Sequence, residues 1–304
     1  MTPAPDLYAL IIRLAAVRGG GLRATQGHLA HAAFLDMLRA VDPALAAAVH
    51  DLPGRKPFTI SPLEGFGRGR DGRLSIREGG EGWLRVTLLD PTLFRTFIRF
   101  FLEGGPRLTL RLEEMEFGVS EVLSTPHSHP LAGHVALAEL AERWDDAPLN
   151  PAHGDIALCF RSPTAFSLRD PAGRFRYAHV LPDPPLVFGE LAGYWDRLTG
   201  AATQAEVRDF AAAGVAVARH DVATHMYDYG GGRKQVGFVG RVAFKLLDDS
   251  EPALARHLNR LADLAFFTGI GSKTTMGMGQ VNRVTNDERR ATSSDRSSLA
   301  TRHS

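Results

Sequence analysis

The sequence predicts an α+β fold made of two tandem ferredoxin-like domains. Two observations predict it. The order strand, helix, strand, strand, helix, strand occurs twice along the 304 residues, and a segment rich in proline, histidine and alanine separates the two copies. This split βαβ order is the ferredoxin-like arrangement. The composition agrees, since 44% hydrophobic and 23% charged residues are typical of a globular protein.

The first copy begins with a continuous apolar run at residues 7–17, which is typical of a buried strand. Residues 27–50 follow with apolar side chains at helical spacing. Pro43 is expected to divide this region into two helices, and Asp42 can cap the second. The remaining strands and helix of this copy are expected at residues 56–63, 82–90, 107–117 (strands) and 91–104 (helix).

The second copy has the same order of elements. Its expected strands, helices and hairpin are a strand at 155–166, a helix at 186–200, a hairpin over 214–247 around Gly230 to Gly232, a helix at 251–267 and a short strand at 277–284. The predicted domains are therefore residues 1–123 and 154–285, with a linker at 124–153. Residues 286–304 are polar and without periodicity, so we expect a disordered tail.

Charge and cysteine content exclude several classes of protein. The formal net charge is +1, so any polyanion must be bound by local basic patches. The single cysteine, Cys159, excludes a disulfide framework and a thiolate zinc cluster, and it fits a reducing cytosol. We find no signal peptide pattern and no apolar run long enough to span a membrane. We therefore expect a cytoplasmic protein with no membrane partner.

A glycine-rich stretch at residues 267–280 suggests a phosphate-binding loop. A P-loop would need glycine where Ser272 precedes Lys273, and a dinucleotide fingerprint would need glycine at Thr274. Both motifs also run from strand to helix, whereas this loop runs from helix to strand. A nucleotide-dependent enzyme is therefore disfavoured. The glycines allow the backbone to come close to a ligand, and the lysine and hydroxyl groups beside them suit a phosphodiester chain. The alternative is a loop that only connects a helix to an edge strand.

The stretch GIGSKTTMGMG resembles the C-terminal glycine-rich motif of the RAMP superfamily. More narrowly, the chain resembles the CRISPR-associated endoribonuclease that processes the repeats of precursor CRISPR RNA. Further blocks match in the same order at residues 48–63, 160–195 and 234–246. The resemblance spans roughly residues 7–283 and implies RRM/RAMP-like ferredoxin domains, with RNA carried between the two halves.

This resemblance implies a metal-independent, sequence-specific endoribonuclease without a cofactor. Its partner would be CRISPR repeat RNA within the precursor transcript, and the mature guide RNA could pass to a CRISPR effector complex. RNA carries its own nucleophile, the ribose 2′-OH, and in-line attack leaves a 2′,3′-cyclic phosphate and a 5′-OH. Such an enzyme needs a base, an acid and a cation near the phosphorane. A non-catalytic RNA-binding RAMP subunit of an effector complex is the alternative, and homodimerisation is left open.

Three side chains are the candidate catalytic groups. His50 ends the first helical region, where the helix dipole favours a protonated imidazole, and Lys56 follows six residues later. The resemblance matches both positions to residues that act in cleavage, although His50 could simply cap the helix. Some family members carry a catalytic tyrosine where this chain has Leu35, and His31 is the candidate substitute. The general base is left open between His31, His28 and His50 itself.

The candidate RNA-binding residues fall in three segments. They are Arg68, Arg70 and Arg73 on a glycine-rich hairpin, Arg233 and Lys234 at the tip of the second hairpin, and Gly269, Gly271, Ser272, Lys273, Thr274, Gly277 and Gly279 in the glycine-rich loop. The alternative for the first group is that these arginines only decorate a solvent-exposed loop and bind no phosphate. His127, His129 and His134 cluster in the predicted linker, but no carboxylate accompanies them, and we predict no metal site.

Overall fold

The structure is a computed structural model of the chain. It describes residues 6–23, 26–69, 73–104, 108–147, 155–229, 233–247 and 251–284. The tail predicted from residue 286 and the candidate Arg70 lie outside these residues. Within the described ranges, no helix is long and apolar enough to cross a membrane.

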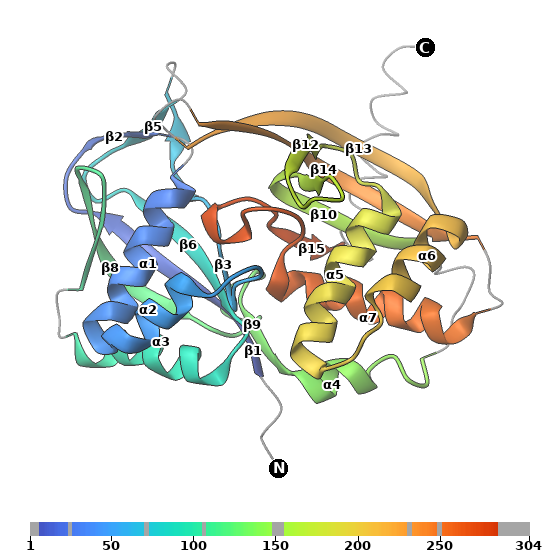
Figure 1. Cartoon of the computed structure of the whole chain (residues 1–304). Coiled ribbons are helices and arrows are strands. Elements are labelled where there is room, and N and C mark those ends of the chain that lie inside the picture. The colour runs from blue at the N-terminus through green and yellow to red at the C-terminus, as the bar shows by residue number, and fades with distance from the viewer. Residues whose placement is uncertain are drawn as a thin grey trace.

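The N-terminal half is built on an antiparallel sheet with strand order β3-β6-β1-β8-β7, with helices packed on one face (Figure 1). Its elements are β1 (Asp6–Ala16), α1 (Gly27–Val41), α2 (Pro43–Asp51), β3 (Phe58–Ile60), β6 (Glu81–Leu88), α3 (Pro91–Glu103), β7 (Thr109–Leu112) and β8 (Met115–Leu123). A separate three-stranded sheet is formed by β2 (Gly20–Arg23), β4 (Gly67–Arg68) and β5 (Arg73–Ile76). The predicted break between α1 and α2 is confirmed, since Asp42 accepts a hydrogen bond from the Leu45 backbone at 2.9 Å.

The C-terminal half repeats this plan with strand order β13-β14-β10-β15. Its elements are β10 (Asp155–Thr164), β11 (Phe166–Arg169), β12 (Phe175–His179), α5 (Pro184–Thr199), α6 (Gln204–Gly214), β13 (Val215–Asp228), β14 (Lys234–Leu246), α7 (Pro252–Thr268), the short 3-10 helix η2 (Thr274–Met276) and β15 (Val281–Arg283). In both halves the four main strands, counted in chain order, lie in the order 2-3-1-4. The chain is thus an α+β protein with two domains of like topology.

Two predicted elements differ from the structure. The single strand expected over 107–117 is a hairpin of β7 and β8, because the chain reverses at Glu113, which has a left-handed φ of 53°. The expected linker at 124–153 contains β9 (Gly133–Ala136), which pairs with β1, and α4 (Leu137–Glu142). Leu137 and Leu140 of this segment are buried in the core that the two halves share, so the segment packs between them rather than standing in solvent.

The β13–β14 hairpin is a long arm that leaves the C-terminal sheet and passes over the N-terminal half (Figure 1). Near its tip, Tyr227 is only 2% exposed, and its hydroxyl accepts a hydrogen bond from the Gly27 backbone at 2.9 Å. Gly27 is the first residue of α1. The arm therefore holds the start of α1 against the C-terminal half, next to the glycine-rich loop.

Candidate functional site

An open groove of about 420 Å³ lies between the two halves of the chain. One wall comes from the segment after α2, at Gly54, Arg55 and Lys56, and the opposite wall from β11, α5 and residues 271–275 of the glycine-rich loop. The structure therefore brings the segment after the predicted catalytic helix and the predicted RNA-binding loop to one groove, although more than 200 positions separate them in the sequence.

His31 lies on α1 where this helix meets the glycine-rich loop. Its Nδ1 lies 3.1 Å from the carbonyl oxygen of Thr275. A carbonyl can only accept, so Nδ1 carries the hydrogen and the neutral ring keeps its lone pair on Nε2. Burial lowers the pKa of His31 below its ordinary value, the bond to Thr275 opposes this, and the charges of His50 and Lys56 lower it further. The neutral form of His31 is thus favoured and held in one tautomer, and the charges of both other candidates act on it.

His50 is exposed near the C-terminal end of α2. A ring sealed in the core could not reach a substrate, and the structure does not place it there. Lys56 is half-buried, and its ammonium donates to the carbonyl oxygens of Val49 at 3.1 Å, His50 at 2.6 Å and Leu52 at 2.5 Å. These acceptors match the three donors of an ammonium group, so Lys56 caps the end of the helix that carries His50.

The glycines of the loop are required by the fold of the loop itself. Gly269, Gly271, Gly277 and Gly279 all have positive φ, between 64° and 88°. A Cβ on Gly279 would lie 2.2 Å from the Ile270 carbonyl oxygen, and Gly277 and Gly279 are buried. Their first explanation is therefore close packing within the loop and against α1.

Two polar residues of the loop, Ser272 and Thr274, bond to the protein, whereas Lys273 faces the solvent. The Ser272 hydroxyl donates to the Ala165 carbonyl at 3.0 Å and accepts from Gln235 at 3.0 Å. Thr274 is buried and hydrogen-bonds to Tyr194. Lys273 is exposed, and its ammonium lies 4.0 Å from the centre of the Tyr229 ring, where burial and the charge of Arg233 lower its pKa. Lys273 is thus the exposed cation of the loop.

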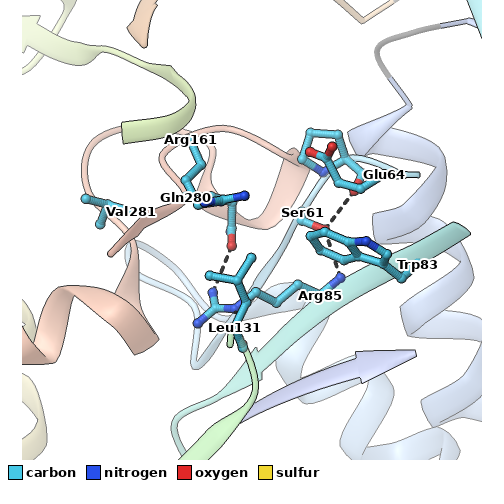
Figure 2. A pocket seen from close by; sticks show the side chains of 9 residues that line it. Ser61, Glu64, Trp83, Arg85, Leu131, Arg161, Gln280 and Val281 are labelled. Atoms are coloured by element: carbon cyan, nitrogen blue, oxygen red, sulfur yellow. Dashed lines mark hydrogen bonds between the residues drawn. The ribbon is translucent and has the colours of Figure 1, made fainter. Parts of the chain in front are cut away.

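A buried arginine, Arg85 of β6, fixes both ends of the loop. It donates to the carbonyl of Phe266, just before the loop, at 2.6 Å and to the side chain of Gln280, the last residue of the loop, at 2.9 Å; Figure 2 shows the bond to Gln280. It also donates to the Leu131 carbonyl at 2.8 Å. Burial lowers the pKa of Arg85 to about 9, which leaves it charged at neutral pH. Gln280 in turn donates to Thr59 of β3 at 3.1 Å, so a hydrogen-bonded chain joins the loop to the N-terminal sheet.

Several predicted binding residues lie away from the groove. Arg68 and Arg73 belong to the β4–β5 hairpin of the small sheet, and Arg73 donates to the Gly21 carbonyl at 2.9 Å. Lys234 is exposed at the start of β14, opposite Asp228. Arg233 is exposed and acts electrostatically on Lys273. Burial lowers the pKa of His28, and the charged groups that act on it are Glu113, Arg23, Arg233 and Asp228 rather than His50 or Lys56.

Two of the three histidines at residues 127–134, His129 and His134, contact other residues of the protein. Nδ1 of His129 accepts from the Leu131 backbone at 3.1 Å, and the ring of His134 lies 6.5 Å from that of Tyr8. His127 is exposed. Among the described residues, no group of three or more His, Cys, Asp or Glu side chains is arranged to hold a metal ion.

Sequence reasoning missed Tyr227, Arg85 and the β11–β12 hairpin. Each depends on contacts between segments distant along the chain, such as the bond from Gly27 to Tyr227, 200 positions apart. A partial signal existed for the hairpin alone, since SLRDPAGRFRYAH places arginines and aromatics on either side of a Pro-Ala-Gly turn.

Two family descriptions match the chain. Residues 7–142 match the CRISPR Cas6 N-terminal domain, and residues 158–281 match the CRISPR-associated endoribonuclease Cas6. A comparison with curated proteins finds no match.

Several solved structures are similar over nearly the whole chain. A product complex of Cas6 (TTHB231) shares 32% identity, covers 91% of this chain and 99% of its own, and has a TM-score of 0.75. Thermus thermophilus Cas6 (TTHB231) shares 29% identity over 92% of this chain and 99% of its own, with a TM-score of 0.67. A product complex of Cas6 (TTHA0078) shares 27% identity over 92% and 100%, with a TM-score of 0.68.

Proposed function

The chain belongs to the Cas6 family of CRISPR-associated endoribonucleases, and on that premise we propose that it cleaves CRISPR repeat RNA in the precursor transcript by a metal-independent reaction at the groove. The observation that carries this proposal is that His31 contacts the glycine-rich loop and Lys56 lines the same groove as that loop, while the charge of His50 acts on His31. The relatives were solved as product and substrate-mimic complexes, which supports repeat RNA as the ligand of this chain.

In the proposed reaction, His31 is the general base and His50 the general acid. Nε2 of His31 removes the proton of the ribose 2′-OH, and the oxygen attacks the adjacent phosphorus. The bond from phosphorus to the 5′ oxygen breaks, and His50 gives that oxygen a proton. The products are a 2′,3′-cyclic phosphate and a 5′-OH. The tautomer set by Thr275 and the lowered pKa of His31 both suit a base at neutral pH.

Lys56 acts in this scheme by positioning. Its three bonds hold the end of α2, so it fixes where His50 presents its ring. Its positive charge remains beside the groove and adds to the field that a dianionic phosphorane would experience. The glycine-rich loop has a parallel role for His31, through the carbonyl of Thr275.

RNA contacts follow the exposed cations of the groove. We assign phosphate contacts to Lys273 in the groove and to Arg233, which lies outside the groove but acts electrostatically on Lys273, while Gly269, Gly271, Gly277, Gly279, Ser272 and Thr274 shape the loop. Arg68, Arg73 and Lys234 would contact RNA only outside the groove. We also propose that both domains are ferredoxin-like, on the strength of the strand order 2-3-1-4, with boundaries near residues 123 and 154.

The test uses the repeat RNA transcribed beside the gene of this protein. The wild type should cut it in EDTA and leave a 2′,3′-cyclic phosphate. A single 2′-deoxy substitution before the cut should block cleavage without weakening binding. His31→Ala and His50→Ala should bind the RNA and not cut it. Binding without cleavage by the wild type would leave a non-catalytic RNA-binding subunit as the better description.

A further inference from the structure

The β11–β12 hairpin forms part of the groove wall opposite Lys56. Phe166, Ser167 and Arg169 of β11 line the groove together with the glycine-rich loop. In the ladder of this hairpin, Arg169 pairs with Phe175 and Leu168 pairs with Tyr177. The register shifts between these two pairs, and Arg176 is the extra residue on β12, so side chains do not alternate regularly from Phe175 to Tyr177. Leu168 and Arg169 are adjacent on β11 and point to opposite faces, and paired residues share a face, so Phe175 stands on the face of Arg169 and Tyr177 on that of Leu168.

Phe175 is 60% exposed, which the packing of this chain does not explain. It lies outside the apolar clusters of the two domains, whereas Phe166, at the other end of the hairpin, is buried in one of them. An exposed aromatic ring paired across the strands with a groove-lining arginine is a recurrent arrangement in proteins that bind unpaired nucleotides.

The turn of the hairpin is closed by an ion pair and a hydrogen bond, and the hairpin carries more positive than negative charge. Arg174 forms an ion pair with Asp170 at 2.8 Å across the turn, and Arg169 donates to the Gly173 carbonyl at 2.7 Å. Arg176 adds a further exposed positive charge. A closed turn keeps the Arg169 and Phe175 pair in one place before a ligand arrives, which reduces the entropy lost on binding.

We propose that Arg169 and Phe175 form a stacking platform for one unpaired base of the RNA, at a nucleotide that flanks the cleaved phosphate. The inference rests on the proposed function, because it is the RNA strand in the groove that brings a base to this wall. RNA is favoured over a second copy of this chain as the occupant because Arg169, Lys56 and Lys273 line the same groove, and these charges complement a phosphodiester chain.

The platform is tested by binding of fluorescent repeat RNA to a His50→Ala background, which prevents cleavage. Phe175→Ala and Arg169→Ala should each weaken binding about tenfold, the range of one base–aromatic stack. Phe175→Trp should bind as well as Phe175. Tyr177→Ala is the matched control, because Tyr177 is a similarly exposed aromatic, at 48%, on the other face of the same hairpin, and it should bind like the parent.

A scan with abasic nucleotides identifies the stacked base. One abasic position near the cut should weaken binding to the parent by the same factor as Phe175→Ala, and it should cause no further loss in the Phe175→Ala protein. Additive losses at every position would overturn the platform, as would an equal loss in Tyr177→Ala.

The outcome also separates this inference from the proposed function. Failure of the wild type to bind or cut repeat RNA would refute the proposed function. Normal cutting by the wild type and unchanged binding by Phe175→Ala would refute the platform alone. A change of molecular mass in Phe175→Ala by light scattering, with unchanged RNA affinity, would identify this face as a contact between copies and would equally overturn it.

Discussion

The imidazole of His31 and the carbonyl of Thr275 lie 3.1 Å apart across the boundary between the two halves of the chain. This contact joins a side chain of the first helix to the main chain of a loop 244 positions later. The glycine-rich loop thus has a role that its sequence did not suggest, namely to hydrogen-bond the imidazole of His31. The loop selects the tautomer of the proposed base, so its conformation and the chemistry are linked through one hydrogen bond.

Replacing His31 by asparagine should separate the contact from the chemistry. The amide nitrogen of Asn can keep the donor to Thr275, but it supplies no base. We expect His31→Asn to bind RNA normally and to lose cleavage by at least about 100-fold, the usual contribution of a general base.

In the wild type, burial lowers the pKa of His31, so the single-turnover rate should fall on acidification only below pH 6.5. Measured pH–rate profiles in EDTA would check both, and an asparagine variant with wild-type rates would refute the role.

A methyl group at Gly27 should push α1 away from the loop. A Cβ there would lie 1.7 Å from the Met276 carbonyl oxygen and 2.5 Å from the Tyr227 hydroxyl. We expect Gly27→Ala to destabilise the protein by about 2 kcal/mol or more and to reduce cleavage in the molecules that remain folded. Denaturant unfolding measures the first effect and single-turnover kinetics the second. Gly118→Ala is the control, since its nearest neighbour would be 3.9 Å away, and it should be close to neutral.

The order of elements was predictable because it depends on local patterns. The apolar run of β1, the Asp42–Pro43 break and the proline that opens α3 are each readable within a few residues. The turn at Glu113 was not, because a left-handed glutamate has no strong sequence signature. Nor was the burial of α4, which depends on partners from both domains.

The candidate site was chosen from the sequence, and its members and their roles stay predictions. His50 and Lys56 were chosen from a motif and His31 as the substitute for a missing tyrosine, and in the structure the charges of His50 and Lys56 act on His31. The glycines were expected to approach a ligand, but most of their close contacts are with the protein itself, which no composition can reveal. The hydrogen bonds of Lys56 could not be predicted from the sequence either, because its carbonyl partners depend on how the chain turns after α2.

Removing Arg85 should loosen the glycine-rich loop at both ends. Arg85 is only 4% exposed, and its guanidinium donates to the Leu131 and Phe266 carbonyls and to the Gln280 side chain. Arg85→Met fills much of the space but leaves those acceptors buried without a donor. We expect a loss of about 3 kcal/mol in unfolding free energy and a lower cleavage rate constant. Gln280→Leu removes a single bond and should cost less; an Arg85→Met protein of wild-type stability would contradict this account.

The cap at Lys56 distinguishes positioning from direct contact with the phosphate. Lys56→Met should cost about 1–2 kcal/mol, through three unmet carbonyls at the end of a helix, and should reduce the cleavage rate by displacing His50. Lys234→Met is the control at an exposed lysine outside the groove and should leave stability unchanged. A Lys56→Met protein that keeps full stability and loses cleavage would instead place the ammonium on the phosphate.

The stability of the C-terminal half should depend on pH through His257. This residue is 6% exposed and lies among Arg260, whose guanidinium nitrogen is 3.2 Å from its Nδ1, the Thr203 hydroxyl at 3.3 Å and the carboxylate of Asp196. Burial, reinforced by the charge of Arg260 and opposed by Asp196, lowers the pKa of His257 to about 4. In the unfolded chain, the imidazole of His257 is therefore protonated as the pH falls through about 6.5. In the folded chain it is protonated only near pH 4. The contribution of His257 to the free energy of unfolding is complete above pH 6.5 and declines toward pH 4, by up to about 3 kcal/mol.

Urea unfolding at pH 7.5 and pH 4.5 should show this decline in the wild type. His257→Gln should show a smaller one, because glutamine does not titrate, and equal slopes in both proteins would assign the acid sensitivity to other histidines.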